Sequence, residues 1–471
     1  MARSDIGLVG LGVMGANLAR NIASKKFRAS VYNRTIIKTD AFIRKFGSTN
    51  LTGYAKLKDF VGSLERPRKI ILMVKAGKAV DEVVAELVPL LSKGDILIDC
   101  GNSLYTDTIR REKSLARKGM FFYGCGLSEG EEGALLGPSL MVGGNKNTWK
   151  SFEKIFKSIA AKDFTGKPCA AYLGENGAGH FVKMVHNGIE YAVLQMMAEA
   201  YELLSRGYYM SAYEVAAVFK EYNEGRLKSF LLEISVHVLR RKDDPTKNAL
   251  IDVVLDKAGK KSTDKWTVLE GLERGIVISP ITSAGEAQII SNSKEERGRL
   301  SKLFKKPMPS FSIDRDSIIG KLENTLYAGI MIAYAQGFRL LRQAAEEQKW
   351  KLNFAEIARI WEGGFIIRAE MLRVIHEAFS SSDTSELWEN QKIAQSLSAA
   401  LQDSREVVGE AIKNGIPLFS LGAALTSFEA FTNEKTPTNF IQALRDAFGA
   451  HTYERIDQKG TFHTEWVMRR K

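Results

Sequence analysis

The first third of the chain alternates short apolar runs with longer stretches in which apolar residues recur about every 3.6 positions. The apolar runs begin near Asp5, Ala29, Lys69 and Asp95, and a loop and a helical pattern follow each of them. This alternation predicts a parallel, doubly wound sheet with helices on its faces. We therefore predict an α/β domain over residues 1–177.

Helical spacing dominates from Gly179 to about Phe431, where strand signals nearly disappear. Two parts of this region resemble each other, residues 187–204 and residues 324–341, so we expect a doubled helical unit. We therefore predict a large all-α domain over residues 178–434.

The C-terminal residues 435–471 show little amphipathic periodicity after Phe448, yet they contain several aromatic and histidine side chains. A tail without a core of its own has to bury against something else, and a partner subunit is the simplest candidate. We expect this tail to reach a second copy of the chain.

Composition narrows the possible classes of protein. The 471 residues have a net charge of +12, but Lys and Arg are spread along the chain without a block of like charge. The excess of positive charge therefore indicates binding of small anions or a solvated surface, and not binding of nucleic acid. Three cysteines, Cys100, Cys125 and Cys169, have no paired metal spacing, which favours reduced thiols, a cytoplasmic location and no metal site. No apolar run approaches transmembrane length, and membrane insertion is not expected.

The first apolar run leads into a glycine-rich turn, with Gly10, Gly12 and Gly15 around Val13 and Met14. In the dinucleotide-binding fingerprint, the first glycine permits the tight turn, the second lets the pyrophosphate approach, and the third lets helix and strand pack. The pattern alone is weak, but here a helix, expected to begin near Ala16, and a second strand complete a βαβ unit. We predict a Rossmann-type cofactor site.

The second strand ends in Asn33, Arg34 and Thr35, where an NAD-specific site would place an acidic residue. A cation with amide and hydroxyl groups suits the 2′-phosphate of NADP; the alternative is an ordinary polar turn. Further polar loops follow later strands, at Val74, Lys75 and Ala76, at Asn102, and at Ser128, Glu129 and Gly130. The carboxyl ends of parallel strands share one edge of the sheet, so these loops predict a ligand site there.

A stretch of the first long helix, from Lys183 to Tyr191, places four reactive side chains on one stripe. Lys183, His186, Asn187 and Glu190 stand at positions i, i+3, i+4 and i+7 and therefore share one face. A solvated stripe with an incidental histidine is the simpler interpretation. The glycine-rich approach at residues 174–179 favours a ligand site instead, because it lets a ligand come close to the backbone at a helix start.

Six blocks in order, from the glycine loop to the tail, resemble the decarboxylating 6-phosphogluconate dehydrogenases. They begin at Asn33, Val74, Gly101, Gly130, Lys183 and Phe448. The resemblance implies a homodimer in which a Rossmann domain binds NADP, an all-α domain forms the dimer, and the tail threads into the other subunit. It also implies that 6-phosphogluconate is oxidised and decarboxylated to ribulose 5-phosphate, as in the pentose phosphate pathway.

The resemblance also assigns roles within the site. Lys183 takes the proton of the substrate's 3-hydroxyl and returns one to the C3 oxygen as CO2 departs, and Glu190 protonates C1 of the resulting enediol. A free lysine has a pKa of about 10.4, so such a site must favour the neutral amine. The remaining substrate residues implied are Asn102, Ser128, Glu129, Gly130, His186, Asn187, Tyr191, Lys261, Thr263 and Gln288, with Arg445 and His451 from the other subunit.

Several positions depart from the family pattern. Gln288 stands where the family has arginine, and Glu129 stands in the substrate loop where the family has glycine. Further departures are Ser262 and Asp264 with an extra Lys260 in the phosphate loop, Glu362 for arginine, and Cys100 for glycine. None of them replaces Lys183 or Glu190. Two alternatives therefore remain: a related β-hydroxyacid dehydrogenase with a changed substrate such as gluconate, and a non-catalytic NADP-binding protein.

Overall fold

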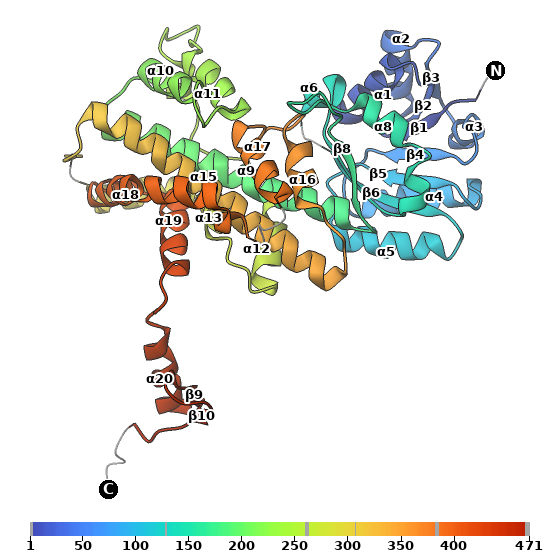
Figure 1. Cartoon of the computed structure of the whole chain (residues 1–471). Coiled ribbons are helices and arrows are strands. Elements are labelled where there is room, and N and C mark those ends of the chain that lie inside the picture. Colours follow the sequence, from blue (N-terminus) through green and yellow to red (C-terminus); the bar gives the residue numbers. More distant parts are fainter. Residues whose placement is uncertain (1–2, 128–129, 260–262, 307, 382–385, 467–471) are drawn as a thin grey trace. The chain divides into compact units, whose positions relative to one another are not determined.

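The computed structural model describes residues 3–127, 130–259, 263–306, 308–381 and 386–466. The chain divides into two compact units, Met1–Ala424 and Leu425–Lys471. Figure 1 shows the elements of both. The strands of the first unit are β1 (Ile6–Val9), β2 (Ala29–Tyr32), β3 (Leu51–Tyr54), β4 (Lys69–Leu72), β5 (Ile96–Asp99), β6 (Phe121–Leu127), β7 (Leu140–Gly143) and β8 (Ala170–Gly174).

These strands form one sheet in the order β3-β2-β1-β4-β5-β6-β7-β8. The first six in sequence are parallel, as predicted, whereas β7 runs antiparallel to β6 and β8 runs parallel to β7. Their buried residues separate into two cores, one around Leu8 and Val31 and the other around Val9 and Leu72. Because successive side chains of a strand face opposite sides, both faces of the sheet are covered.

The helices that accompany this sheet connect its strands, as expected for a doubly wound fold. They are α1 (Val13–Ser24), α2 (Ile36–Phe46), α3 (Leu57–Gly62), α4 (Lys78–Leu87), α5 (Tyr105–Ala116), α6 (Glu131–Leu136), α7 (Lys146–Trp149) and α8 (Glu153–Ile159), with the 3₁₀ turn η1 (Val88–Leu90). The first helix begins directly after Gly12 and not near Ala16, so its first turn belongs to the glycine loop itself.

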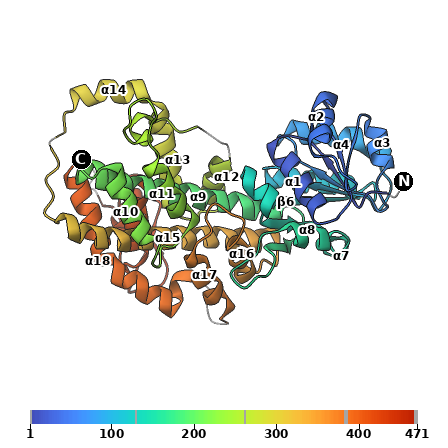
Figure 2. The same cartoon turned by 90° about the horizontal axis from the view of Figure 1, so that it is seen from above.

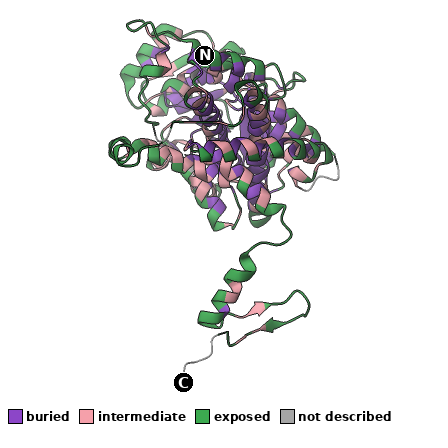
Figure 3. Ribbon diagram, turned by 90° about the vertical axis from the view of Figure 1, so that its left-hand side faces the viewer, coloured by how far each residue is buried: buried purple, intermediate pink, exposed green. Residues whose placement is uncertain are grey.

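The chain after β8 is helical, as predicted. Its helices in the first unit are α9 (Ala178–Glu202), α10 (Ala212–Tyr222), α11 (Phe230–Arg240), α12 (Thr263–Glu273), α13 (Ser279–Asn292), α14 (Lys294–Leu303), α15 (Arg315–Gln348), α16 (Phe354–Trp361), α17 (Glu370–Ser380) and α18 (Gln391–Lys413), with short turns η2 (Leu203–Gly207), η3 (Leu250–Val253) and η4 (Leu387–Glu389); α19 (Phe419–Phe431) crosses the unit boundary. The long helices α9 and α15 lie against each other near the centre of this region (Figure 2), and most of their residues are buried. Figure 3 shows that the buried residues of the first unit gather in its interior.

The expected doubling agrees with this arrangement. Each long helix is followed by a shorter packed pair, α10 with α11 and α16 with α17. An isolated bridge joins Ser229, before α11, to Ala369, before α17. The expectation of a phosphate loop that includes Asp264 is wrong in its last part, because α12 begins at Thr263.

The second unit contains α20 (Thr438–Gly449) and an antiparallel hairpin of β9 (Tyr453–Glu454) and β10 (Thr461–Phe462). Asp446 is fully buried and accepts hydrogen bonds from the backbone of Thr452 and Thr464 and from the side chains of His463 and Trp466, at 2.7–2.9 Å. Burial by itself raises the pKa of Asp446, but these donors hold it below its ordinary value. One carboxylate thus joins the helix to the hairpin.

Among the described helices, none combines the length and the low charge that a membrane-crossing segment requires.

Candidate active site

The glycine loop between β1 and α1 has the geometry that a dinucleotide requires. Gly10 has a φ of +104°, and a Cβ on Gly15 would lie 2.0 Å from the carbonyl oxygen of Gly10, so neither position accepts a side chain. A Cβ on Gly12, in contrast, would meet no atom within 4 Å. Gly12 therefore faces open space at the start of α1, where backbone N–H groups and the helix dipole favour a phosphate. The loop fits the pyrophosphate of a dinucleotide.

The turn after β2 is fixed to this loop. The side-chain oxygen of Asn33 accepts a hydrogen bond of 3.0 Å from the backbone N–H of Leu11. Asn33, Arg34, Thr35 and Lys38 line a cavity of about 300 Å³. The Arg34 guanidinium is 83% exposed and lies 3.8 Å from Glu82, so it is available to an anionic ligand. Two cations at this turn fit the 2′-phosphate of NADP.

A neighbouring cavity of about 640 Å³ extends along the carboxyl ends of β1, β4, β5 and β6. Predicted cofactor residues from three separate loops meet there: Gly12, Val13, Met14, Gly15, Val74, Lys75, Ala76 and Asn102. Asp99 shapes the turn that carries Asn102, because its carboxylate accepts hydrogen bonds from the Gly101 N–H at 3.0 Å and the Ser103 hydroxyl at 2.6 Å. The structure thus brings together the loops that the sequence placed at one sheet edge.

The reactive stripe lies on α9 and is buried, which contradicts the interpretation as a solvated face. Lys183, His186, Asn187 and Glu190 are exposed by 2%, 0%, 2% and 7%. The ammonium group of Lys183 donates to the side-chain oxygen of Asn187 at 2.7 Å, and Nδ1 of His186 lies 3.2 Å from the same oxygen. Burial and the nearby Lys183 charge hold the pKa of His186 well below its ordinary value.

The neutral His186 has one ring nitrogen left for a ligand. Because the Asn187 oxygen can only accept, Nδ1 of His186 carries the proton. Its Nε2 is buried and has no hydrogen-bond partner in the described part of the chain. A buried acceptor of this kind costs stability unless something donates to it, and a sugar hydroxyl would do so.

Two aromatic side chains that follow the long helix α15, Trp361 and Phe365, form a wall over the stripe. The ring of Phe365 lies 4.0 Å from the ring of His186 and 5.0 Å from the ammonium group of Lys183, and Trp361 meets His186 edge-on at 5.3 Å. The wall depends on two glycines, because a Cβ would lie 2.3 Å from the Lys162 oxygen at Gly363 and 2.6 Å from the Gly137 oxygen at Gly364.

The stripe and the cofactor cavity meet at β6. A Cβ on Gly126 would lie 2.4 Å from the Cβ of Lys183, so this glycine lets α9 approach the strand. The next residue, Leu127, lines the 640 Å³ cavity. The base candidate therefore lies directly behind the strand that forms one wall of the cofactor site.

The remaining predicted substrate residues are distributed as follows. Tyr191 is half-buried on α9, and Gly130 is exposed with a φ of +144°. Gln288 is half-buried on α13, and its side-chain oxygen has no hydrogen-bond partner among the described residues. Arg445 and His451 are exposed in the second unit. Ser128, Glu129, Lys260, Lys261 and Ser262 lie outside the described residues, and so do the side chains of Thr263 and Asp264.

Several site residues were not predicted from the sequence; Lys38, in the 300 Å³ cavity, is one of them, and three aromatic residues are others. Phe365 and Trp361 form the aromatic wall, and Trp266 of α12 lines the cofactor cavity. A signal existed for the first two, since Trp361 begins a Trp-Glu-Gly-Gly segment that follows the second long helix. For Trp266 the only signal in the sequence was its position next to the predicted phosphate loop.

A dinucleotide cavity beside a buried stripe with a base and an acid defines the class of protein: a Rossmann-type dehydrogenase. Two family models match nearly the whole chain, the NAD binding domain of 6-phosphogluconate dehydrogenase over residues 5–174 and the 6-phosphogluconate dehydrogenase C-terminal domain over residues 179–466. The chain therefore belongs to the decarboxylating 6-phosphogluconate dehydrogenase family.

Individual relatives agree with this assignment. The decarboxylating 6-phosphogluconate dehydrogenase of Lactococcus lactis is 46% identical, with 99% of each chain covered. The NADP(+)-dependent, decarboxylating enzyme of Bacillus subtilis is 44% identical, with 99% of this chain and 100% of the relative covered. A solved structure of the Plasmodium falciparum 6-phosphogluconate dehydrogenase is 40% identical with a TM-score of 0.95, covering 98% of this chain and 100% of that one. The family predicted from the sequence is confirmed, and with it an NADP-dependent enzyme class.

Proposed function

We propose that this protein oxidises and decarboxylates 6-phospho-D-gluconate to ribulose 5-phosphate and CO2, with NADP as the oxidant. The observation that carries the proposal is the buried stripe of Lys183 and Glu190 next to the cofactor cavity. The relative from P. falciparum is described with NADP+ and with 6-phosphogluconate, which supports the same pair of ligands here.

The chain's own residues divide the proton transfers between them. NADP, when bound, accepts the hydride that leaves C3 of the substrate. Lys183 takes the proton of the 3-hydroxyl during this step and returns one to the C3 oxygen as CO2 departs. Glu190 then delivers a proton to C1 of the enediol that remains after the loss of CO2, which gives ribulose 5-phosphate. Base and acid are separate groups on one helix face, so each keeps the protonation state that its step requires.

We assign the other polar groups to substrate binding. The Nε2 atom of His186 accepts from a sugar hydroxyl, and Asn187, which holds Lys183 at 2.7 Å, orients both. The further substrate-binding residues proposed are Asn102, Ser128, Glu129, Gly130, Tyr191, Lys261, Thr263 and Gln288.

The direct test is NADPH formation and CO2 release by the purified protein with 6-phosphogluconate, run beside gluconate and 3-hydroxyisobutyrate. We expect equal amounts of NADPH and CO2 from 6-phosphogluconate alone. Turnover of gluconate instead would mean a changed substrate, and no turnover with NADP still bound would mean a non-catalytic protein.

Arg34 is expected to select NADP over NAD. Replacing it with alanine removes a charge-assisted hydrogen bond to the 2′-phosphate, which contributes about 1.5–3 kcal/mol. The KM for NADP should rise about 10- to 100-fold, and that for NAD should change little. Lys78→Ala is the control, because Lys78 lies 3.7 Å from the same Glu82 but does not line the cavity. Equal effects of the two substitutions would contradict the assignment.

Gln288 marks the place where the phosphate end of the substrate is expected. Gln288→Arg should lower the KM for 6-phosphogluconate about 10-fold, because a guanidinium binds phosphate with charge-assisted hydrogen bonds. The same variant should leave the KM for NADP unchanged. An unchanged KM for 6-phosphogluconate would show that the phosphate lies elsewhere.

We also propose that the protein is a homodimer, with residues 1–177 as the cofactor domain, 178–434 as the dimer domain and 435–471 reaching the partner's site through Arg445 and His451. Helix α20 supports a buried role for the tail, since Phe440 and Phe448 are 66% and 75% exposed in the single chain. Light scattering that gives the mass of one chain would exclude the homodimer.

We place the enzyme in the cytoplasm. Its three cysteines are buried and form no disulfide, which suits a reducing compartment.

A further inference from the structure

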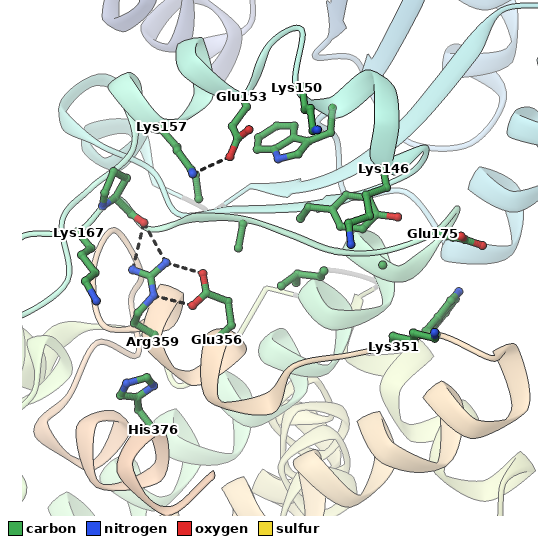
Figure 4. A pocket seen from close by; sticks show the side chains of 18 of the residues that line it. Lys146, Lys150, Glu153, Lys157, Lys167, Glu175, Lys351, Glu356, Arg359 and His376 are labelled. Carbon is green, nitrogen blue, oxygen red and sulfur yellow. Dashed lines mark hydrogen bonds and ion pairs between the residues drawn. The ribbon is translucent and has the colours of Figure 1, made fainter. Parts of the chain in front are cut away.

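A third cavity lies at the outer edge of the sheet, away from the residues assigned to NADP and to the substrate. Its volume is about 1020 Å³. The edge strand β8 forms its floor, α7 and α8 one wall, and α16 with residues 349–351 the other. Figure 4 shows its side chains. None of the residues proposed for catalysis lines it, so it has no role in the reaction derived above.

The lining of this cavity has a strong excess of positive charge. Six lysines and Arg359 line it, against Glu153, Glu175 and Glu356. Two of the three acids are already paired, Glu153 with Lys157 at 2.6 Å and Glu356 with Arg359 at 2.6 Å. The lysines that make no ion pair with any described residue are Lys146, Lys150, Lys167, Lys349 and Lys351. Only Glu175 opposes these five, which leaves an excess of four positive charges.

The shape of the cavity makes this charge more effective than the same charge on a flat surface. The buried side chains of Trp149, Leu173 and Trp350 form an apolar backing, with exposed fractions of 5%, 3% and 6%. A concave surface with low-dielectric walls focuses the field of the charges around it. Unpaired lysines in one cavity also repel one another, and a bound anion removes that cost.

The positions of the cations indicate which anion fits. The labelled lysines come from both walls of the cavity and from both ends of β8, with Lys167 near one end and Lys351 near the other (Figure 4). A single small anion would reach only part of this set, whereas an anion with several charged groups would reach both walls. The two tryptophans are buried and offer no free ring face, which argues against stacked nucleic-acid bases.

We propose that this cavity binds a small metabolite that carries two or more phosphate groups. The site is independent of the proposed reaction. Bound there, the ligand connects β8 to the segment of residues 349–351. That segment already contacts the residues just before α9, the helix that carries Lys183 and Glu190, because the indole N–H of Trp350 donates to the Asn176 side chain at 2.9 Å. The ligand should therefore raise the Tm of the whole first unit.

The test uses inorganic triphosphate as the probe in titration calorimetry, at about 150 mM salt to screen non-specific attraction. NADPH and 6-phosphogluconate are present at saturation, so that the sites proposed for cofactor and substrate are occupied without turnover. We expect one triphosphate per chain. The double variant Lys150→Glu/Lys351→Glu should weaken binding at least about 10-fold, since it reverses a charge on each wall.

A matched double variant, Lys58→Glu/Lys154→Glu, makes the same change in net charge at exposed lysines outside the cavity. It should change the affinity less than about twofold. Equal loss in both double variants, or no saturable binding by the wild-type protein, would overturn the proposal. Binding of an oligoglutamate peptide without binding of triphosphate would also overturn it, and would assign the cavity to an acidic protein segment.

Discussion

Replacing Lys183 with methionine is expected to lower kcat by about 10³-fold, the range that a positioned general base contributes. Methionine keeps most of the buried volume next to Phe365 but removes the Nζ atom that donates to Asn187 at 2.7 Å. The stripe then lacks the amine that we assign to take the proton of the 3-hydroxyl. Steady-state assays of NADPH formation measure the effect.

The affinity of the same variant for NADP should change less than about twofold. Lys183 is assigned to the chemical step, and losing a group that acts only in that step lowers turnover without weakening cofactor binding. Lys183 does not line the 640 Å³ cavity, whose lining comes from the carboxyl ends of the strands and the loops after them, and from α1, α5 and α12. Fluorescence titration with NADPH measures this affinity. Lys154→Met, at an exposed position on α8, is the control for the loss of one lysine. A parallel loss of turnover and NADP affinity in Lys183→Met would remove its assignment as the base.

Local spacing in the sequence was sufficient for much of this site. The roles of Gly10, Gly12 and Gly15 follow from a short loop between one strand and one helix, and the structure has the positive φ and the close contacts that those roles require. The stripe on α9 follows from helical periodicity alone. Each of these features depends on residues that are near one another in the chain.

Contacts between distant segments could not be predicted in the same way. Phe365 covers His186 from the other helical unit, and its position depends on two glycines packed against the loop before β7 and the residues before β8. The antiparallel direction of β7 could not be predicted either, because a buried apolar strand such as Leu140–Gly143 has no local signal for its direction. Only the simpler interpretation of the stripe, as a solvated face, is wrong: polar residues at helical spacing are more often solvated than buried, but this stripe is buried.

Replacing Glu190 with glutamine is expected to slow turnover about 10²-fold by a different route from Lys183→Met. Glutamine keeps the size of the side chain but has no acidic proton to deliver. Hydride leaves C3 of the substrate before C1 of the enediol needs its proton, so the first chemical step should remain fast in this variant. Rapid mixing with NADP and 6-phosphogluconate should give a burst of about one NADPH per active site, followed by slow steady-state turnover.

The burst separates the two roles on the stripe, because Lys183→Met should give none. Glu202→Gln is the control on the same helix: Glu202 pairs with Arg206 at 2.6 Å near the end of α9, away from the stripe, and should turn over normally. A slow Glu190→Gln variant without a burst would mean that Glu190 acts before or during oxidation. The carboxylate would then serve to position Lys183 or His186, and another group would have to protonate C1.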